Sequence, residues 1–132
     1  MTAKELFKLA DCAREKSYSP YSNITVGAAL LCGSGKVYTG ANIENAAYSP
    51  SVCAERVAIF SAIHAGESEF VMLAVAGGKH GEAARECFTP CGVCRQVMAE
   101  FCKGNFKVVL SESDALDFSD LLPYRFDGDK IK

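Results

Sequence analysis

Two short segments decide the fold of this chain: Ser51-Val52-Cys53-Ala54-Glu55-Arg56 and Thr89-Pro90-Cys91-Gly92-Val93-Cys94-Arg95. Each opens an apolar run with helical spacing. Because Ser and Thr are common helix N-caps and Pro is tolerated at the first helical position, we expect Ser51 and Thr89 to cap two helices. Gly66 and Gly104 would end them. We predict that the two helix N-termini face each other and share one zinc ion.

Strand-like segments alternate with these helices. Helices alternating with buried strands favour a three-layer α/β/α sandwich around a mixed, roughly five-stranded sheet, in one domain spanning residues 1–132. The strands are expected at Ile24–Cys32, Lys36–Ile43, Phe70–Ala76 and Phe106–Leu110, with a possible short edge strand within Ser111–Asp117. Further helical segments are expected from Thr2, as N-cap, to about Lys16, and at Phe118–Leu122.

Composition excludes several classes of protein. With 132 residues, 49% of them hydrophobic, and a net charge of −2, the chain fits a globular protein without a basic surface for nucleic acid. No apolar run is long enough for a membrane span, so we expect a cytoplasmic protein that binds neither membrane nor polynucleotide. Seven cysteines, an odd number, argue against a secreted disulfide scaffold and for metal or redox chemistry.

The thiol spacing predicts a metal site with one open position. Cys91 and Cys94 are three residues apart, and Cys53 would begin the other helix. Three thiolates leave one corner of a zinc tetrahedron free for water, as in catalytic sites. Glu55 lies beside that corner as a candidate proton carrier, and Arg56 is the preferred cation to offset the thiolate charge. A redox dithiol is one rival interpretation of the Cys-x-x-Cys pair.

The second rival is a structural-zinc interaction domain, in which Cys87 would close a four-cysteine site. That interpretation leaves Glu55 and the polar loop around Asn42 and Glu44 without a purpose. The occupant of the fourth zinc position, water or sulfur, would separate the two.

The motifs Cys53-Ala54-Glu55 and Pro90-Cys91-Gly92-Val93-Cys94-Arg95-Gln96 closely resemble those of the zinc-dependent cytidine deaminase family, in its small, homotetrameric, all-cysteine-ligand form. Gly40 to Ser49 is similar to the ribose-recognition loop of that family, and Leu121-Leu122-Pro123 with Phe126 is similar to its tail. The resemblance covers about Leu6 to Phe126.

The resemblance implies hydrolytic deamination of cytidine and 2′-deoxycytidine in pyrimidine salvage, with one zinc per subunit. It implies that Glu55 carries protons between water, N3 of the base and the leaving amine. It also implies a homotetramer with sites at subunit interfaces. The implied zinc ligands are Cys53, Cys91 and Cys94, and the implied substrate contacts are Asn42, Glu44, Ala54, Ile24, Tyr48 and, from a neighbouring subunit, Phe126.

This chain departs from the family pattern at Ile24, where the family usually has a Phe that packs on the pyrimidine. Ile supplies apolar area without an aromatic ring, so we expect base binding to be weaker by roughly 0.5–1.5 kcal/mol. The segment from Gly77 to Cys87 is longer than usual, and Thr89 replaces the more frequent Ser.

Overall fold

A five-stranded mixed sheet forms the centre of the computed structural model, which describes residues 1–132. The strand order is β2-β1-β3-β4-β5; β3 and β4 run parallel, and the other neighbours are antiparallel. The strands are β1 (Ile24–Cys32), β2 (Val37–Ala41), β3 (Phe70–Lys79), β4 (Lys107–Val109) and β5 (Ala115–Asp117). The predicted mixed sheet is therefore confirmed.

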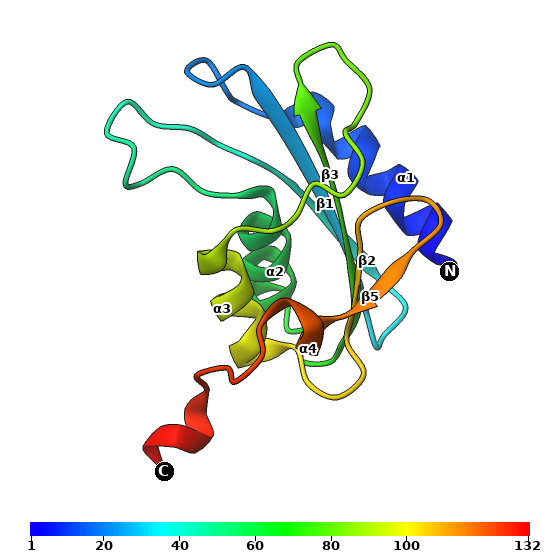
Figure 1. Cartoon of the computed structure of the whole chain (residues 1–132), viewed down its shortest axis with the longest axis vertical. Helices are drawn as coiled ribbons and strands as arrows, with labels where there is room; N and C mark the ends of the chain where they lie inside the picture. The colour runs from blue at the N-terminus through cyan, green and yellow to red at the C-terminus, as the bar shows by residue number, and fades with distance from the viewer.

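Helices cover both faces of this sheet (Figure 1). Helix α1 (Ala3–Ala13) lies on one face, while α2 (Ala54–His64) and α3 (Gly92–Phe101) lie side by side on the other. The remaining helical segments are short: η1 (Arg14–Lys16), α4 (Phe118–Leu121) and η2 (Gly128–Ile131). This is the α/β/α sandwich that the alternation of elements predicts, and its last residues project away from the body of the molecule.

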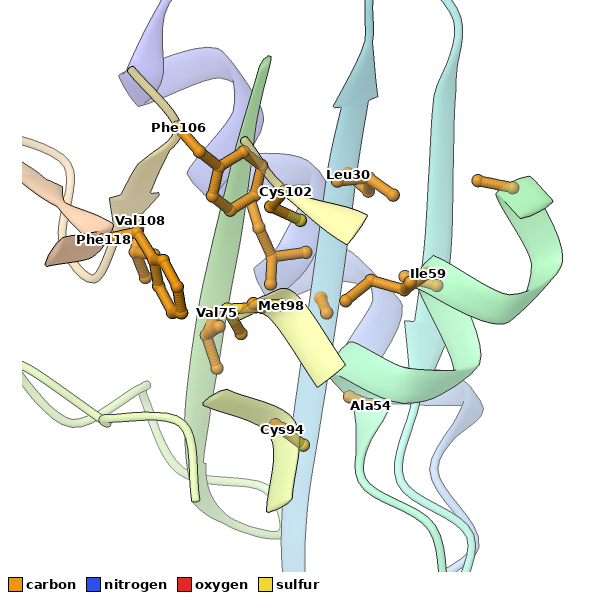
Figure 2. Packing of buried hydrophobic residues seen from close by; sticks show 14 of the residues in the cluster. Leu30, Ala54, Ile59, Val75, Cys94, Met98, Cys102, Phe106, Val108 and Phe118 are labelled. Carbon is orange, nitrogen blue, oxygen red and sulfur yellow. The ribbon is translucent and has the colours of Figure 1, made fainter. Parts of the chain in front are cut away.

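Two apolar clusters hold the layers together. The smaller packs α1 onto the sheet through Leu6, Phe7 and Ala10. The larger lies between the sheet and the α2/α3 pair, and Figure 2 shows Ala54 and Cys94 at the same end of it, at the starts of α2 and α3. Burial of these side chains therefore fixes the two helix N-termini next to each other.

Thr2 is the N-cap of α1 as predicted, but the N-caps predicted for α2 and α3 were wrong. The N-cap of α2 is Cys53, because Val52 is held extended by a β-bridge to Ile43 while the Ser51 hydroxyl accepts a hydrogen bond from Asn45 N over 3.0 Å. The N-cap of α3 is Cys91, so Pro90 lies outside the helix. Neither cysteine side chain caps its helix, and both helix starts keep free N–H groups.

Smaller differences concern exposure and element ends. Cys12, expected in the core, is exposed on α1, whereas Cys32 and Cys102 are buried as expected. Strand β2 ends at Ala41 because the next side chain, Asn42, turns to bond β1, and α3 ends at Phe101 because Cys102 is buried in an extended conformation. Every helix is too short or too polar to cross a bilayer.

Candidate metal centre and binding cavity

Three cysteine sulfurs meet where α2 and α3 begin. The Sγ atoms of Cys53, Cys91 and Cys94 all lie within 4.8 Å of one another, and those of Cys53 and Cys91 are 3.6 Å apart. Two thiolates bound to one tetrahedral zinc at about 2.3 Å lie roughly 3.8 Å from each other, so this donor set fits zinc. The expected meeting of the two helix starts is confirmed.

The cluster has no fourth protein ligand among its cysteines, histidines and acids. Cys87 is exposed and lies outside the group of sulfurs, so the four-cysteine closed site is not formed. The carboxylate of Glu55 is also outside the group. Three donors leave one tetrahedral position for water or substrate, which is the arrangement of a catalytic zinc site.

Local electrostatics favour the thiolate form of Cys53. A hydrogen bond with Cys94, together with Arg56, whose Nη2 donates to Cys53 Sγ over 3.4 Å, lowers the pKa of Cys53 to about 5. The same hydrogen bond, together with burial, raises the pKa of Cys94. The N-terminal dipoles of α2 and α3 act in the same direction as Arg56.

Glu55 is a buried acid with a shifted pKa. Its side chain is only 3% exposed, and this burial, assisted by the charge of Cys53, raises its pKa to about 7. Glu55 lies in the first turn of α2, and its carboxylate lines the adjoining cavity beside the sulfurs of Cys94 and Cys53. A carboxyl group with a pKa near neutrality can both accept and return a proton.

A cavity of about 480 Å³ adjoins the cluster and is large enough for a small ligand. Besides Cys53, Cys91, Glu55 and Arg56, its walls include the predicted residues Ile24, Asn42, Glu44 and Ala54. A second hollow of about 340 Å³ shares Ser22, Glu44 and Ser51 with it and contains Tyr48. The structure therefore brings these predicted residues to one place.

Phe126 is the predicted residue that the structure does not bring to the cavity of its own chain. Its side chain is 57% exposed, and its carbonyl accepts a hydrogen bond from Gln96 Nε2 on α3 over 2.8 Å. Tyr48 lies at the rim of the second hollow, 76% exposed, with its ring edge-on to Tyr21 at a centroid distance of 6.5 Å.

Two polar side chains of the cavity wall, Asn42 and Glu44, are held by β1 and by the loop before it. Asn42 Oδ1 accepts hydrogen bonds from Val26 N and Ser17 Oγ, and Asn42 Nδ2 donates to Ile24 O over 2.9 Å. This uses both acceptor positions and one of the two donor hydrogens of the amide. One N–H of Asn42 is left for a ligand.

Glu44 is held by the same loop. Its Oε1 accepts from Tyr21 N at 2.9 Å and Ser22 N at 3.1 Å, and its Oε2 accepts from Ser22 Oγ. The Ser22 hydroxyl also accepts from Ile24 N over 3.0 Å, so its own hydrogen points to Glu44. These donors lower the pKa of Glu44 and leave its carboxylate about one acceptor position for a ligand.

Sequence reasoning missed three residues of this region: Ser22, which orients Glu44; Phe88, which lines the cavity; and Gly40, under the start of α2. Ser22 lies in the segment Pro20-Tyr21-Ser22, whose composition is typical of a turn and indicates a polar loop directly before β1. Phe88 and Gly40 act through contacts between distant segments, and spacing along the chain carries no record of such contacts.

Comparison with known proteins agrees with this geometry. Residues 1–110 match the family model described as "Cytidine and deoxycytidylate deaminase zinc-binding region". A curated cytidine deaminase of Halalkalibacterium halodurans is 43% identical over 99% of this chain and 98% of its own length, and one of Sporosarcina psychrophila is 47% identical over 84% of this chain and 78% of its own.

Solved structures give the same result. The crystal structure of a cytidine deaminase from Burkholderia pseudomallei superposes with a TM-score of 0.85 at 47% identity, covering 96% of this chain and all of that one. A cytidine deaminase from Mycobacterium tuberculosis superposes with a TM-score of 0.84 at 32% identity, covering 96% of this chain and 98% of that one.

Proposed function

This chain belongs to the cytidine and deoxycytidylate deaminase family, and we propose that it hydrolyses cytidine and 2′-deoxycytidine to uridine and 2′-deoxyuridine plus ammonia. One observation carries the proposal: a buried carboxyl group, Glu55, with a pKa near 7 lines the same cavity as an open-sided cluster of three thiols. Binding alone would not require a carboxyl group tuned in this way.

Cys53, Cys91 and Cys94 would hold the zinc ion. When bound, zinc supplies the Lewis acidity that activates water for addition to C4 of the base. Glu55 accepts the proton that this water loses and delivers it to N3 of the pyrimidine. It then moves the second proton to the amino group, which leaves as ammonia while the C4 carbonyl of uridine forms. Arg56 offsets the negative charge of the thiolates beside Cys53.

Asn42 and Glu44 would bind the sugar. After the bonds within the chain are counted, Asn42 has one donor left and Glu44 about one acceptor. A single hydroxyl group can accept from the one and donate to the other. The 3′-hydroxyl is common to cytidine and 2′-deoxycytidine, which supports both as substrates. Ile24 and the backbone at Ala54 would contact the base.

The test of this function follows the ultraviolet absorbance of cytidine and the release of ammonia, with and without a zinc chelator. We expect turnover that the chelator abolishes and added zinc restores. Glu55→Gln is the matched variant: it should keep the fold and the zinc while turnover falls by about 10²–10⁴-fold. Zinc-dependent binding of cytidine without any turnover by the wild-type protein would overturn the proposal.

A substrate series tests the sugar contacts. Removal of the 3′-hydroxyl, measured as 2′,3′-dideoxycytidine against 2′-deoxycytidine, should weaken binding far more than removal of the 2′-hydroxyl, measured as 2′-deoxycytidine against cytidine. Equal losses from both changes would show that Asn42 and Glu44 do not share one hydroxyl.

We further propose that the protein acts in pyrimidine salvage in the cytoplasm as one deaminase domain, and that it assembles as a homotetramer. All seven cysteines are free, which supports a reducing compartment. Apolar side chains left exposed on the tail and on α2, Phe126 at 57%, Ile131 at 77% and Phe60 at 45%, support association of several chains.

Phe126 would contact the substrate of a neighbouring subunit, and Tyr48 would lie at the same boundary. Light scattering gives the oligomeric state. Co-expression of Glu55→Gln and Phe126→Ala subunits tests the shared site, because mixed assemblies should recover turnover that neither variant has alone. Recovery no greater than the sum of the two variants would mean that each chain completes its own site.

A further inference from the structure

Phe88 is the single aromatic residue among those that line the main cavity. It is half-buried and packs against the edge of the larger apolar cluster. The cavity wall around it is aliphatic, with Ile24, Val26 and Val52, or polar. Within the cavity wall that this chain itself supplies, a flat, apolar ring face is therefore available to a ligand at Phe88 only.

The backbone of β3 leaves space for this ring. A Cβ atom built on Gly77 would lie 2.6 Å from Cδ1 of Phe88, closer than real Cβ contacts, so any larger residue at position 77 would displace the ring. Gly77 O accepts a hydrogen bond from Arg85 N over 2.8 Å, which ties the segment before Phe88 to β3. Cys87 turns the chain with a positive φ of 55°.

These contacts hold the Phe88 ring in place before a ligand arrives. A side chain that is already ordered loses little conformational entropy on binding, so its contact contributes most of its interaction energy to affinity. Phe88 is in addition only three residues before Cys91, at the sulfur-cluster end of the cavity, whereas Asn42 and Glu44 contribute the polar groups for a sugar. A base whose C4 must reach the cluster has to lie at the Phe88 end.

We propose that Phe88 forms the aromatic wall of the pyrimidine site and takes the part in base binding that Ile24, being aliphatic, cannot play. This inference rests on the proposed function. It also alters the expectation for Ile24: the cavity keeps one aromatic contact, so Ile24→Phe should give no gain in affinity for cytidine.

The experiment compares two competitive inhibitors of the wild-type and variant enzymes: uridine, whose base is planar, and 5,6-dihydrouridine, whose ring has similar size but lacks the C5=C6 double bond and is therefore puckered and non-aromatic. In Phe88→Leu we expect the inhibition constant of uridine to rise about three- to tenfold, as for the loss of an aromatic contact. That of dihydrouridine should change less than twofold. The KM for cytidine should rise by about the same factor as the inhibition constant of uridine. The kcat of the variant should stay within about twofold of the wild-type value, since Phe88 does not take part in proton transfer.

Three controls accompany this comparison. Phe88→Tyr keeps the ring and should retain tight binding of uridine. Phe118→Leu makes the same exchange at a buried site in the core outside the cavity, so it should lower the melting temperature without changing either inhibition constant. Phe88→Met fills a similar volume with a flexible side chain and gives the same test if Phe88→Leu fails to fold.

Equal changes for uridine and dihydrouridine, or no change for either, would make Phe88 a packing residue and overturn the inference. Neither result touches the proposed function, which depends on cytidine turnover by the wild-type enzyme. Conversely, if the wild-type enzyme bound uridine but did not deaminate cytidine, the function would fail while the two binding constants, measured by calorimetry, would still test Phe88.

Discussion

The guanidinium group of Arg56 lies against the sulfur of Cys53: Nη2 donates to Sγ over 3.4 Å, and Nε is buried with no partner. A partly buried cation with an unsatisfied, buried N–H is costly unless a negative charge faces it. The three-thiol cluster supplies that charge. Arg56 and the cluster therefore stabilise each other, and the helical turn from Cys53 to Arg56 links them directly.

Replacement of this cation should lower turnover more than it lowers zinc content. In Arg56→Gln the thiolates pass more negative charge to the metal, which makes it a weaker acid. Hydrogen bonds to charged groups contribute about 1.5–3 kcal/mol, so we expect kcat to fall about ten- to a hundredfold. Metal analysis and steady-state kinetics measure the two effects separately.

Arg95→Gln is the matched control for Arg56. Arg95 also lies near the cluster, but its side chain bonds the backbone carbonyls of Pro90 at 2.9 Å and Leu121 at 2.8 Å. The Arg95→Gln substitution should therefore lower the melting temperature and leave kcat near the wild-type value. A larger loss of kcat in Arg95→Gln than in Arg56→Gln would contradict our assignment.

Ser22 sets the pH range in which Glu44 is ionised. Hydrogen bonds from the Ser22 hydroxyl and from backbone N–H groups hold the pKa of Glu44 below its usual value, so the wild-type carboxylate stays charged as the pH falls through the normal range for Glu. Ser22→Ala removes the strongest of these donors, and the pKa should rise toward the ordinary value. Binding of uridine, whose base does not ionise in this range, should then weaken at a higher pH than in the wild type.

The control for this pH profile is Ser34→Ala. Ser34 likewise donates to a carboxylate, Glu67 Oε1 at 2.7 Å, but on the hairpin between β1 and β2, outside the cavity. In Ser34→Ala the loss of uridine binding at low pH should occur at the same pH as in the wild type. Identical acid limbs for Ser22→Ala and the wild type would mean that Glu44 does not bind the sugar in its ionised form.

Gly40 sets the position of the α2 N-terminus. A Cβ atom there would lie 2.5 Å from Ala54 O and 2.6 Å from Ala58 N, and these backbone atoms cannot yield without moving the helix. Gly40→Ala should lower the free energy of unfolding by about 1–3 kcal/mol, as overpacking typically does. Because Cys53 occupies the N-cap position of the same helix, zinc affinity should fall as well. Chemical denaturation and competition with a chelator measure these two quantities.

Gly92→Ala serves as the control for Gly40→Ala. Gly92 lies between the two cysteines of α3, yet a Cβ atom there would meet nothing within 4 Å. Stability and zinc affinity should be unchanged or slightly higher. If Gly92→Ala cost as much as Gly40→Ala, the effect would come from the flexibility of glycine and not from the close approach of β2 to α2.

Thiol labelling should divide the seven cysteines into three groups. Cys12 and Cys87 are exposed and outside the cluster, so two thiols should react in the zinc-loaded enzyme. A chelator should make Cys53 and Cys91 reactive, which raises the count to four. Cys94 and two other buried thiols, Cys32 and Cys102, should react only on unfolding.

Two further observations bear on this labelling. Burial raises the pKa of Cys32 to about 11 and that of Cys102 to about 12, which keeps both in the unreactive thiol form. Mass spectrometry of the labelled peptides identifies each site. Labelling of four or more thiols before chelation would contradict a metal held by the cluster.

Local patterns along the chain were enough to predict the architecture and the metal cluster. Helical periodicity placed α2 and α3, continuous apolar runs placed β3 and β4, and Cys-x-x-Cys with a distant third cysteine indicated the shared site. Such patterns work because helix geometry and side-chain burial are set by neighbours a few residues apart. The three thiols and Glu55 lie in two short segments of this kind.

Contacts between segments far apart in sequence decided the rest. The N-caps are Cys53 and Cys91 and not Ser51 and Thr89, and at α2 the β-bridge between Ile43 and Val52 outweighs the intrinsic capping preference of Ser51. The hydrogen bonds that hold Glu44, the space that Gly77 leaves for Phe88, and the burial that raises the pKa of Glu55 likewise exist only once the sheet brings these segments together. Sequence alone determined which chemical groups are present and which helices carry them, since those follow from local order. Tertiary structure alone decided how those groups are oriented and charged, because hydrogen bonding, packing and desolvation depend on distance in space.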